Sequence, residues 1–205
     1  MLSDIISKLF YNIWPMLVVF ITALGLLRFF YLKNHRERFN FYKDFSYLIT
    51  IIYFLLLFEI LTMNELNMIA GVNLIPFSEI SRYPFGSTMF NYNVFGNIIL
   101  FIPFGYIIGL YVKPKKIFPV IITTFITSVV IEFVQLKIGR SFDIDDILLN
   151  VIGGVVGYLL FIGLMAILKR LPDFFRSKLF YNLLCLVFIG IILIYVFGYW
   201  SVLFK

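Results

Sequence analysis

The sequence predicts an all-α membrane protein, a bundle of about six transmembrane helices with a re-entrant or interfacial outer loop. Composition is the first of two observations behind this prediction. Of 205 residues, 62% are hydrophobic and only 14% are charged, with a mean hydropathy of +1.01, whereas a typical soluble domain carries about 25% charged residues. This excludes a soluble enzyme and a disordered tail that coats nucleic acid. The single cysteine, Cys185, excludes an intrachain disulfide framework.

The second observation is the length of the apolar runs, because a helix needs about 20 apolar residues to cross the hydrocarbon core. Helices are expected for all of these runs, since the bilayer core leaves backbone polar groups without water. No small-residue cleavage site follows the first run, so we expect a retained span there rather than a signal peptide. The six runs are Phe10–Leu32, Phe45–Met63, Val94–Val112, Ile117–Leu136, Ile147–Leu168 and Leu179–Trp200.

Lysine and arginine are divided unevenly between the two sides of the predicted bundle. With the N-terminus outside, 12 of the 17 lie on the cytoplasmic side. Because basic loops stay inside, we expect both termini to be extracytoplasmic and the whole chain to form a single membrane domain. Attraction to anionic lipid explains the basic inner loops, so no nucleic-acid partner is expected.

The outer loop is predicted over Asn64–Asn93, and it is too apolar for a plain hydrophilic connection. Its middle, Asn73–Phe77, is typical of a turn that re-enters or follows the membrane interface. Aromatic residues in this loop suit the head-group layer. They are Phe77, Tyr83, Phe85 and Phe90.

Polar side chains inside the spans are costly and usually face a bundle interior or a wet cavity. On the fourth span four of them fall within an arc of about 80°, namely Thr124, Ser128, Glu132 and Gln135. The fifth span has a face about 100° wide with an acidic and amide upper half and a glycine lower half. Glycine permits close approach of a neighbouring helix. This face carries Asp143, Asp146, Asn150, Gly153, Gly154 and Gly157.

A short connection, Lys137–Phe142, makes these two spans antiparallel neighbours whose polar faces meet at the outer end of the bundle. Arg140 in this connection has a planar fork suited to carboxylates or phosphates. The third span adds Asn97 near its outer start and a proline–glycine break, Pro103–Gly105, near mid-membrane.

A purely structural interpretation competes with a ligand site. Asp143, Asp145 and Asp146 suit the positive N-terminus of a helix, and Ser141 could cap it. Glu132 and Arg140 could form a buried ion pair that sets helix register. Against this interpretation, a single cap needs one acid, whereas this chain gathers several ionisable groups at one depth.

These motifs carry a family resemblance. The matching segments are Asn73–Phe77, Asn97 with Phe101–Gly105, Glu132-x-x-Gln135, Arg140–Asp146 and Asn150-x-x-Gly153-x-x-x-Gly157. In order and spacing they resemble the VanZ-like family of bacterial integral membrane proteins, over about residues 46–168. The extra first span (10–32) and last span (179–200) lie outside this core. The resemblance implies the bacterial cytoplasmic membrane and an envelope role linked to resistance to teicoplanin, a lipoglycopeptide.

Three functions remain open. A binding protein would hold the polar head of an amphipathic ligand, such as a lipid-linked wall precursor or a lipoglycopeptide, with Arg140 on a phosphate or carboxylate. An intramembrane enzyme would use Mg²⁺ on Asp143, Asp145 and Asp146, with Glu132 as acid or base. A small transporter or flippase would relay protons through buried acids.

The binding protein is the preferred hypothesis, and catalysis stays uncertain. Membrane lipids are the expected partners, and the oligomeric state is left open. No metal and no cofactor are expected, with Mg²⁺ reserved for the enzyme alternative. The expected site is the outer polar cluster of Glu132, Gln135, Arg140, Asp143, Asp145, Asp146 and Asn150, with Asn97, Asn73 and Pro76 at its rim.

Overall fold

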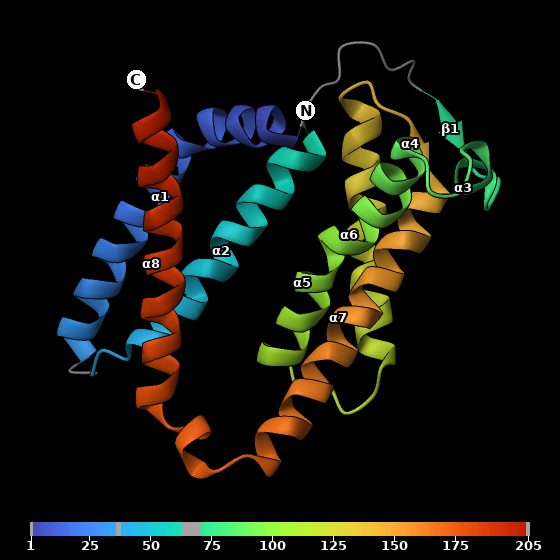
Figure 1. Ribbon diagram of the computed structural model, residues 1–205. Coiled ribbons are helices and arrows are strands. Elements are labelled where there is room, and N and C mark those ends of the chain that lie inside the picture. Colours follow the sequence, from blue (N-terminus) through green and yellow to red (C-terminus); the bar gives the residue numbers. More distant parts are fainter. Residues whose placement is uncertain (1, 36–37, 63–70, 204–205) are drawn as a thin grey trace. The chain divides into compact units, whose positions relative to one another are not determined.

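The computed structural model is almost entirely helical (Figure 1) and describes residues 2–35, 38–62 and 71–203, with side chains described for 13–35, 38–61 and 71–194. The long helices are α1 (Leu2–His35), α2 (Phe41–Thr62), α5 (Gly96–Tyr111), α6 (Phe118–Lys137), α7 (Ile144–Arg170) and α8 (Lys178–Leu203). Short elements are β1 (Val72–Asn73), α3 (Ser78–Arg82), α4 (Thr88–Phe90), the π-helical segment η1 (Asn91–Phe95), β2 (Phe142–Asp143) and the 3₁₀ turn η2 (Asp173–Arg176).

The predicted fold class is confirmed. Within the described residues, five stretches are long and apolar enough to cross a membrane: Ile13–His35, Phe41–Leu61, Thr88–Tyr111, Phe118–Lys137 and Ile144–Arg170. They match the first five predicted spans to within a few residues at most ends. The sixth predicted span lies in α8, where the side chains are described as far as Ile194. The start of the predicted outer loop, residues 64–70, lies outside the described residues.

The chain divides into two compact units. Unit 1 comprises 1–13 and 53–166, and unit 2 comprises 14–52 and 167–205. In unit 2 the Arg28 guanidinium pairs with the Asp44 carboxylate at 2.8 Å, and the Tyr42 amide donates to the Asn182 side chain at 3.1 Å. Every residue of the predicted polar cluster belongs to unit 1.

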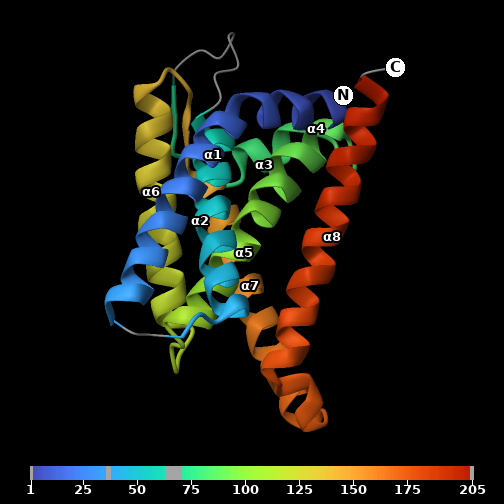
Figure 2. The ribbon, with the colours of Figure 1, turned by 90° about the vertical axis from the view of Figure 1, so that its left-hand side faces the viewer.

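Unit 1 is built around α5, α6 and α7, with α7 antiparallel to α6 (Figures 1 and 2). Its apolar core combines these helices with the second half of α2, through Leu57, Phe101, Phe104, Val120 and Tyr158. Burying such side chains against one another packs these four helices together.

Glycines allow the helices of unit 1 to pack backbone against backbone, as the sequence predicts. A Cβ added to Gly157 would lie 1.9 Å from the Ile102 carbonyl oxygen, and one on Gly105 would lie 1.8 Å from the Gly154 carbonyl oxygen. On its other side, a Cβ on Gly154 would lie 2.5 Å from Thr124 Oγ1. Side chains larger than hydrogen therefore cannot enter these contacts without moving a helix.

The predicted break at Pro103–Gly105 is wrong, because α5 continues as one α-helix through Pro103. The departure from α-helical geometry lies about two to three turns earlier, in η1. The Tyr53 hydroxyl donates to the Leu100 carbonyl at 2.9 Å, so a side chain from α2 supports the helix close to its proline.

Candidate ligand-binding site

A two-residue parallel β-pairing brings the loop to the start of α7. Val72 pairs with Phe142 and Asn73 with Asp143, and the Phe142 amide donates to the Gly71 carbonyl at 2.9 Å. The segment Gly71–Arg82, called the docked loop below, is thereby held against residues about 70 positions later in the chain. The end of unit 1 that carries the docked loop and the start of α7 is called the polar end.

Asp145 fastens the docked loop to α7. Its side chain is fully buried and accepts three backbone N–H groups, from Phe77 at 2.5 Å, Glu79 at 2.8 Å and Ile80 at 3.3 Å. Phe77 has a positive φ of 67°, which is uncommon for a bulky residue and is held by this bond. The carboxylate oxygens of Asp145 are therefore occupied by hydrogen bonds that hold the docked loop in its fold.

Asp143 is the N-cap of α7. Its Oδ1 accepts the Asp145 amide at 2.8 Å, and its Oδ2 accepts Nδ2 of Asn73 at 3.0 Å. Ser141, the cap offered by the structural interpretation, lies two residues too early, because α7 begins at Ile144. The usual N-cap pattern is still followed, because Asp143 precedes the first helical residue and accepts the amide of the second one, Asp145.

Burial raises the pKa of the Asp143 carboxyl, although its hydrogen bonds from Asn73 and from the Asp145 amide act in the opposite direction. Burial also raises the pKa of Glu79, against the attraction of Arg82, whose guanidinium lies 2.6 Å away. These two groups keep their protons to higher pH than exposed carboxyls do. The polar end is therefore less negative at mildly acidic pH than a count of its acids suggests.

Glu132 accepts a hydrogen bond from the backbone and does not form the pair with Arg140 that the structural interpretation would require. Its side chain is 1% exposed, and its Oε2 accepts the Asp143 amide at 2.9 Å. Among the described side chains, Arg140 is not within ion-pair distance of Glu132, so a register-setting ion pair between them is not formed.

Arg140 lies at the end of α2 instead. Its Nη1 donates to the Leu61 carbonyl at 3.1 Å, and Nε2 of Gln135 donates to the same oxygen at the same distance. Carbonyls in the last turn of a helix lack partners within the helix, which explains why two donors converge there. Arg140 has five N–H donors, and within the described residues Leu61 supplies the one acceptor that they reach.

Asp146 faces α5 rather than the docked loop. Nδ2 of Asn97 donates to its Oδ1 at 2.5 Å, which links the start of α5 to α7. The three aspartates at the start of α7, Asp143, Asp145 and Asp146, thus have different hydrogen-bond partners. Across the part of the chain that the structure describes, no three acidic, histidine or cysteine side chains are grouped to hold a metal ion.

The predicted polar stripe of α6 is buried along its whole length. Thr124 and Ser128 are 0% exposed, and Gln135 is 3% exposed. Nδ2 of Asn150 donates to Ser128 Oγ at 2.8 Å, which shows that the stripes of α6 and α7 meet as predicted. The Asn150 Oδ1 is buried without a hydrogen-bond partner among the described residues, and such a group costs free energy unless a donor reaches it.

The structure thus brings the predicted residues to one end of unit 1 in three groups. The first group is a hydrogen-bonded network with the docked loop, formed by Asn73, Glu132, Asp143 and Asp145. The second is the pair of Asn97 and Asp146. In the third, Gln135 and Arg140 both donate to the Leu61 carbonyl. Asn150 lies one turn deeper than Asp146, and Pro76 is exposed in the turn before α3.

The groups that sequence reasoning missed are mostly backbone. They are the Leu61 carbonyl and the amides of Phe77, Glu79 and Ile80, together with the Ser78 hydroxyl that accepts from Asn73 at 2.6 Å. Backbone groups are the same at every position, so no residue type marks them in a sequence.

No curated protein and no solved structure matches the chain. The family model described as VanZ/LLP1 matches residues 41–169, which is more than half of the sequence and includes every residue of the polar network. The match also includes the docked loop and the buried polar stripe of α6, and this chain belongs to the VanZ/LLP1 family.

Proposed function

We propose that this VanZ-family protein lies in the bacterial cytoplasmic membrane with its polar end outside. There it modulates sensitivity to teicoplanin-type glycopeptides by binding the polar head of an amphipathic ligand. The ligand is a lipid-linked wall precursor or the lipoglycopeptide itself.

The observation that carries this proposal is the Arg140 guanidinium. It sits at the polar end, half-buried, with a carbonyl as its acceptor and with no carboxylate in ion-pair contact among the described residues. An arginine held in this way keeps most of its donors for an incoming anion, and its fork can bind a phosphate or carboxylate through two parallel hydrogen bonds. Asp146, half-buried beside Asn97, offers carboxylate oxygen to an amine or sugar hydroxyl of the same ligand.

The same geometry separates supporting residues from binding residues. Asp145 and Asp143 use their oxygens on backbone amides and on Asn73. We assign them to shaping the polar end, while Arg140, Asp146 and Asn97 meet the ligand. Glu132 belongs with the supporting residues, because its Oε2 accepts the Asp143 amide.

The enzyme and transporter alternatives receive less support. A Mg²⁺ site that uses substrate phosphate needs carboxylates aimed at one point, whereas the three aspartates here face different partners. A transport path needs polar groups deeper in the bundle, whereas the lower half of the α5–α7 contact is occupied by glycine against backbone.

The test compares teicoplanin and vancomycin susceptibility in a sensitive Gram-positive host. The strains carry no protein, wild type, Glu132→Gln, Asp146→Asn or Arg140→Gln, with membrane abundance measured by blot. Asp173→Asn is the matched control, because it makes the same carboxylate-to-amide change on an exposed residue of unit 2. We expect selective teicoplanin protection by wild type and by the control, and its loss in the three cluster variants at equal abundance.

Two results would count against the proposal. If wild type is present in the membrane and gives no protection, the drug-related function is wrong. If the cluster variants are lost from the membrane in proportion to their loss of protection, the polar end has a structural role alone.

A further inference from the structure

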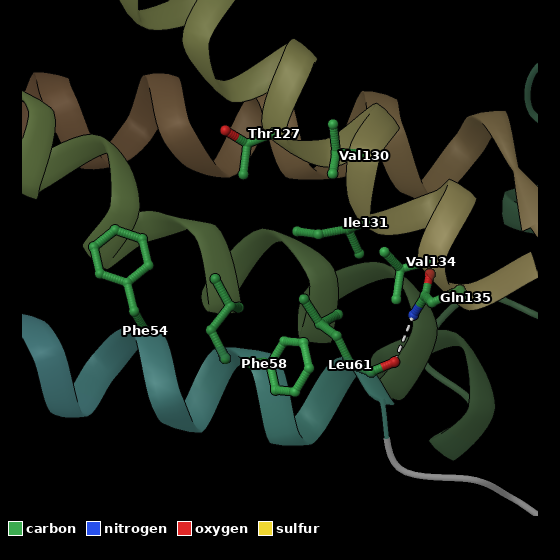
Figure 3. Close-up of a pocket in the computed structure, with 9 residues that line it drawn as sticks. Phe54, Phe58, Leu61, Thr127, Val130, Ile131, Val134 and Gln135 are labelled. Carbon is green, nitrogen blue, oxygen red and sulfur yellow. Dashed lines mark hydrogen bonds between the residues drawn. The ribbon is translucent and has the colours of Figure 1, made fainter. Parts of the chain in front are cut away.

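An apolar groove runs between α2 and α6 and ends at the polar end (Figure 3). It has a volume of about 260 Å³ and lies wholly within unit 1. Its wall is formed by Phe54, Leu57, Phe58, Leu61, Thr127, Val130, Ile131, Val134 and Gln135. Phe58 and Val130 are 60% and 56% exposed, so the groove opens sideways toward the surroundings of the helices.

The length of the groove matches one leaflet. Its lining residues run from Phe54 to Leu61 on α2 and from Thr127 to Gln135 on α6, which at 1.5 Å per residue is about 10–12 Å. Half of a hydrocarbon core is about 15 Å. A groove that starts at the polar end therefore covers most of the leaflet on that side and stops near the bilayer centre.

The lining of the groove suits an apolar occupant. A groove of this length with apolar walls suits one extended hydrocarbon chain. The lining is apolar as far as Gln135, whose amide is already bonded to the Leu61 carbonyl (Figure 3).

The mouth of the groove is cationic. The Leu61 carbonyl that receives Gln135 also receives Arg140 at 3.1 Å, so the guanidinium sits where the apolar lining ends. The remaining N–H donors of the guanidinium favour a head group whose anionic oxygens lie close together. A phosphate meets this requirement, because two of its oxygens can accept from the planar fork of the arginine.

We infer that the groove between α2 and α6 holds one hydrocarbon chain of a phosphate-bearing lipid whose phosphate is bound by Arg140. This inference deepens the proposed function and rests on it in one respect, namely that the polar end binds the head of an amphipathic ligand. It adds where the hydrocarbon chain of that ligand lies and which head-group chemistry Arg140 selects.

The experiment measures lipid retention by the full-length protein with native mass spectrometry after delipidation in detergent. The probes are phosphatidylglycerol, diacylglycerol with the same chains and inorganic phosphate alone. We expect one retained phosphatidylglycerol per chain. Diacylglycerol and inorganic phosphate should each be retained at least about tenfold more weakly, because burial of the hydrocarbon chain and a charge-assisted hydrogen bond each contribute a factor of that order.

Two pairs of variants separate the groove from its mouth. Val130→Trp fills the groove, and Ile126→Trp places the same ring one turn away on α6, outside the lining, at a residue that is also 56% exposed. Arg140→Gln removes the phosphate partner, and Lys137→Gln removes a nearby exposed cation. We expect Val130→Trp and Arg140→Gln to lose retention about tenfold and both controls to keep it within about twofold.

Retention of phosphatidylglycerol by Val130→Trp at the wild-type level overturns the inference. Equal retention of diacylglycerol also overturns it. A lipid-free wild-type dimer that Val130→Trp dissociates overturns it as well, because a second copy of the chain would then occupy the groove. Wild type that binds no phospholipid yet protects against teicoplanin overturns this inference alone. Groove-dependent lipid binding without protection overturns the proposed drug-related function alone.

Discussion

At the scale of single residues, the acidic side chains of the polar end divide by the kind of partner that each one has. Asp145 receives three loop amides, whereas Asp146 receives one side-chain amide from Asn97. A carboxylate saturated by backbone donors holds structure in place, and one with free oxygen positions can still accept from a ligand. Neighbouring residues of the same type thus have different roles because α7 points them to different sides.

Replacing Asp145 tests this division. Asp145→Asn keeps the size of the side chain but presents an amide N–H₂ to amides that need an acceptor. Because hydrogen bonds to charged groups are worth about 1.5–3 kcal/mol each, we expect a loss of about 2–4 kcal/mol in the free energy that holds the docked loop. Limited proteolysis within Gly71–Arg82 should accelerate, measured against wild type and against Asp173→Asn. Cleavage at the wild-type rate would show that Asp145 does not hold the loop.

At the scale of helices, the contact between α5 and α7 depends on missing side chains rather than on complementary ones. Gly105, Gly154 and Gly157 allow carbonyl oxygens and backbones to approach where any Cβ would overlap. Without a hydrophobic driving force between helices in lipid, such close packing is a main source of association. The polar pairs at the top of the same contact, such as Asn97 with Asp146, are thereby held at bonding distance.

Two alanine substitutions on α7 form a matched test. Gly157→Ala places a methyl group 1.9 Å from the Ile102 carbonyl oxygen, whereas Gly163→Ala has open space around it. We expect Gly157→Ala to destabilise unit 1 by about 1–3 kcal/mol through overpacking, and Gly163→Ala to be neutral or to stabilise by up to about 1 kcal/mol through helix propensity. Thermal unfolding in detergent measures both. Equal midpoints for the two variants would contradict the close contact.

At the scale of the whole molecule, charge distribution predicts how the chain sits in its membrane. Of 17 lysines and arginines, 12 fall on the side that holds the loop 113–116 when the N-terminus is outside. That arrangement also puts the docked loop outside, on the side where a glycopeptide or a wall precursor is met. Orientation therefore decides whether the proposed ligand can reach Arg140 at all.

Cysteine labelling measures this orientation directly. In a Cys185→Ala background, Phe85→Cys places a thiol at a loop residue that is 87% exposed, and Lys115→Cys places one in the opposite connection. We expect a membrane-impermeant maleimide to label Phe85→Cys in intact cells and Lys115→Cys only after lysis. The reverse pattern would place the polar end inside the cell and contradict an outward-facing site.

Reading the sequence was enough for features that follow from local repetition. Apolar runs of spanning length predicted the long helices, the 3.6-residue period predicted the buried faces of α6 and α7, and the positions of Gly153, Gly154 and Gly157 predicted close packing. These properties depend on residues near one another in the chain, and so they can be recognised from one sequence. The local sequence predicted a helix break at Pro103, and this prediction is wrong because the neighbouring helices allow α5 to continue through the proline.

Tertiary structure alone decided the partners of the polar residues. Nothing local indicates that Asp145 binds amides 65–68 positions earlier, or that Arg140 reaches a carbonyl of α2 rather than the Glu132 carboxylate. These pairings depend on where the docked loop and the end of α2 lie, and the acceptors and donors involved are largely backbone groups common to all residues. The groove beside Arg140 is likewise a property of two helices 70 residues apart, which no single stretch of sequence encodes.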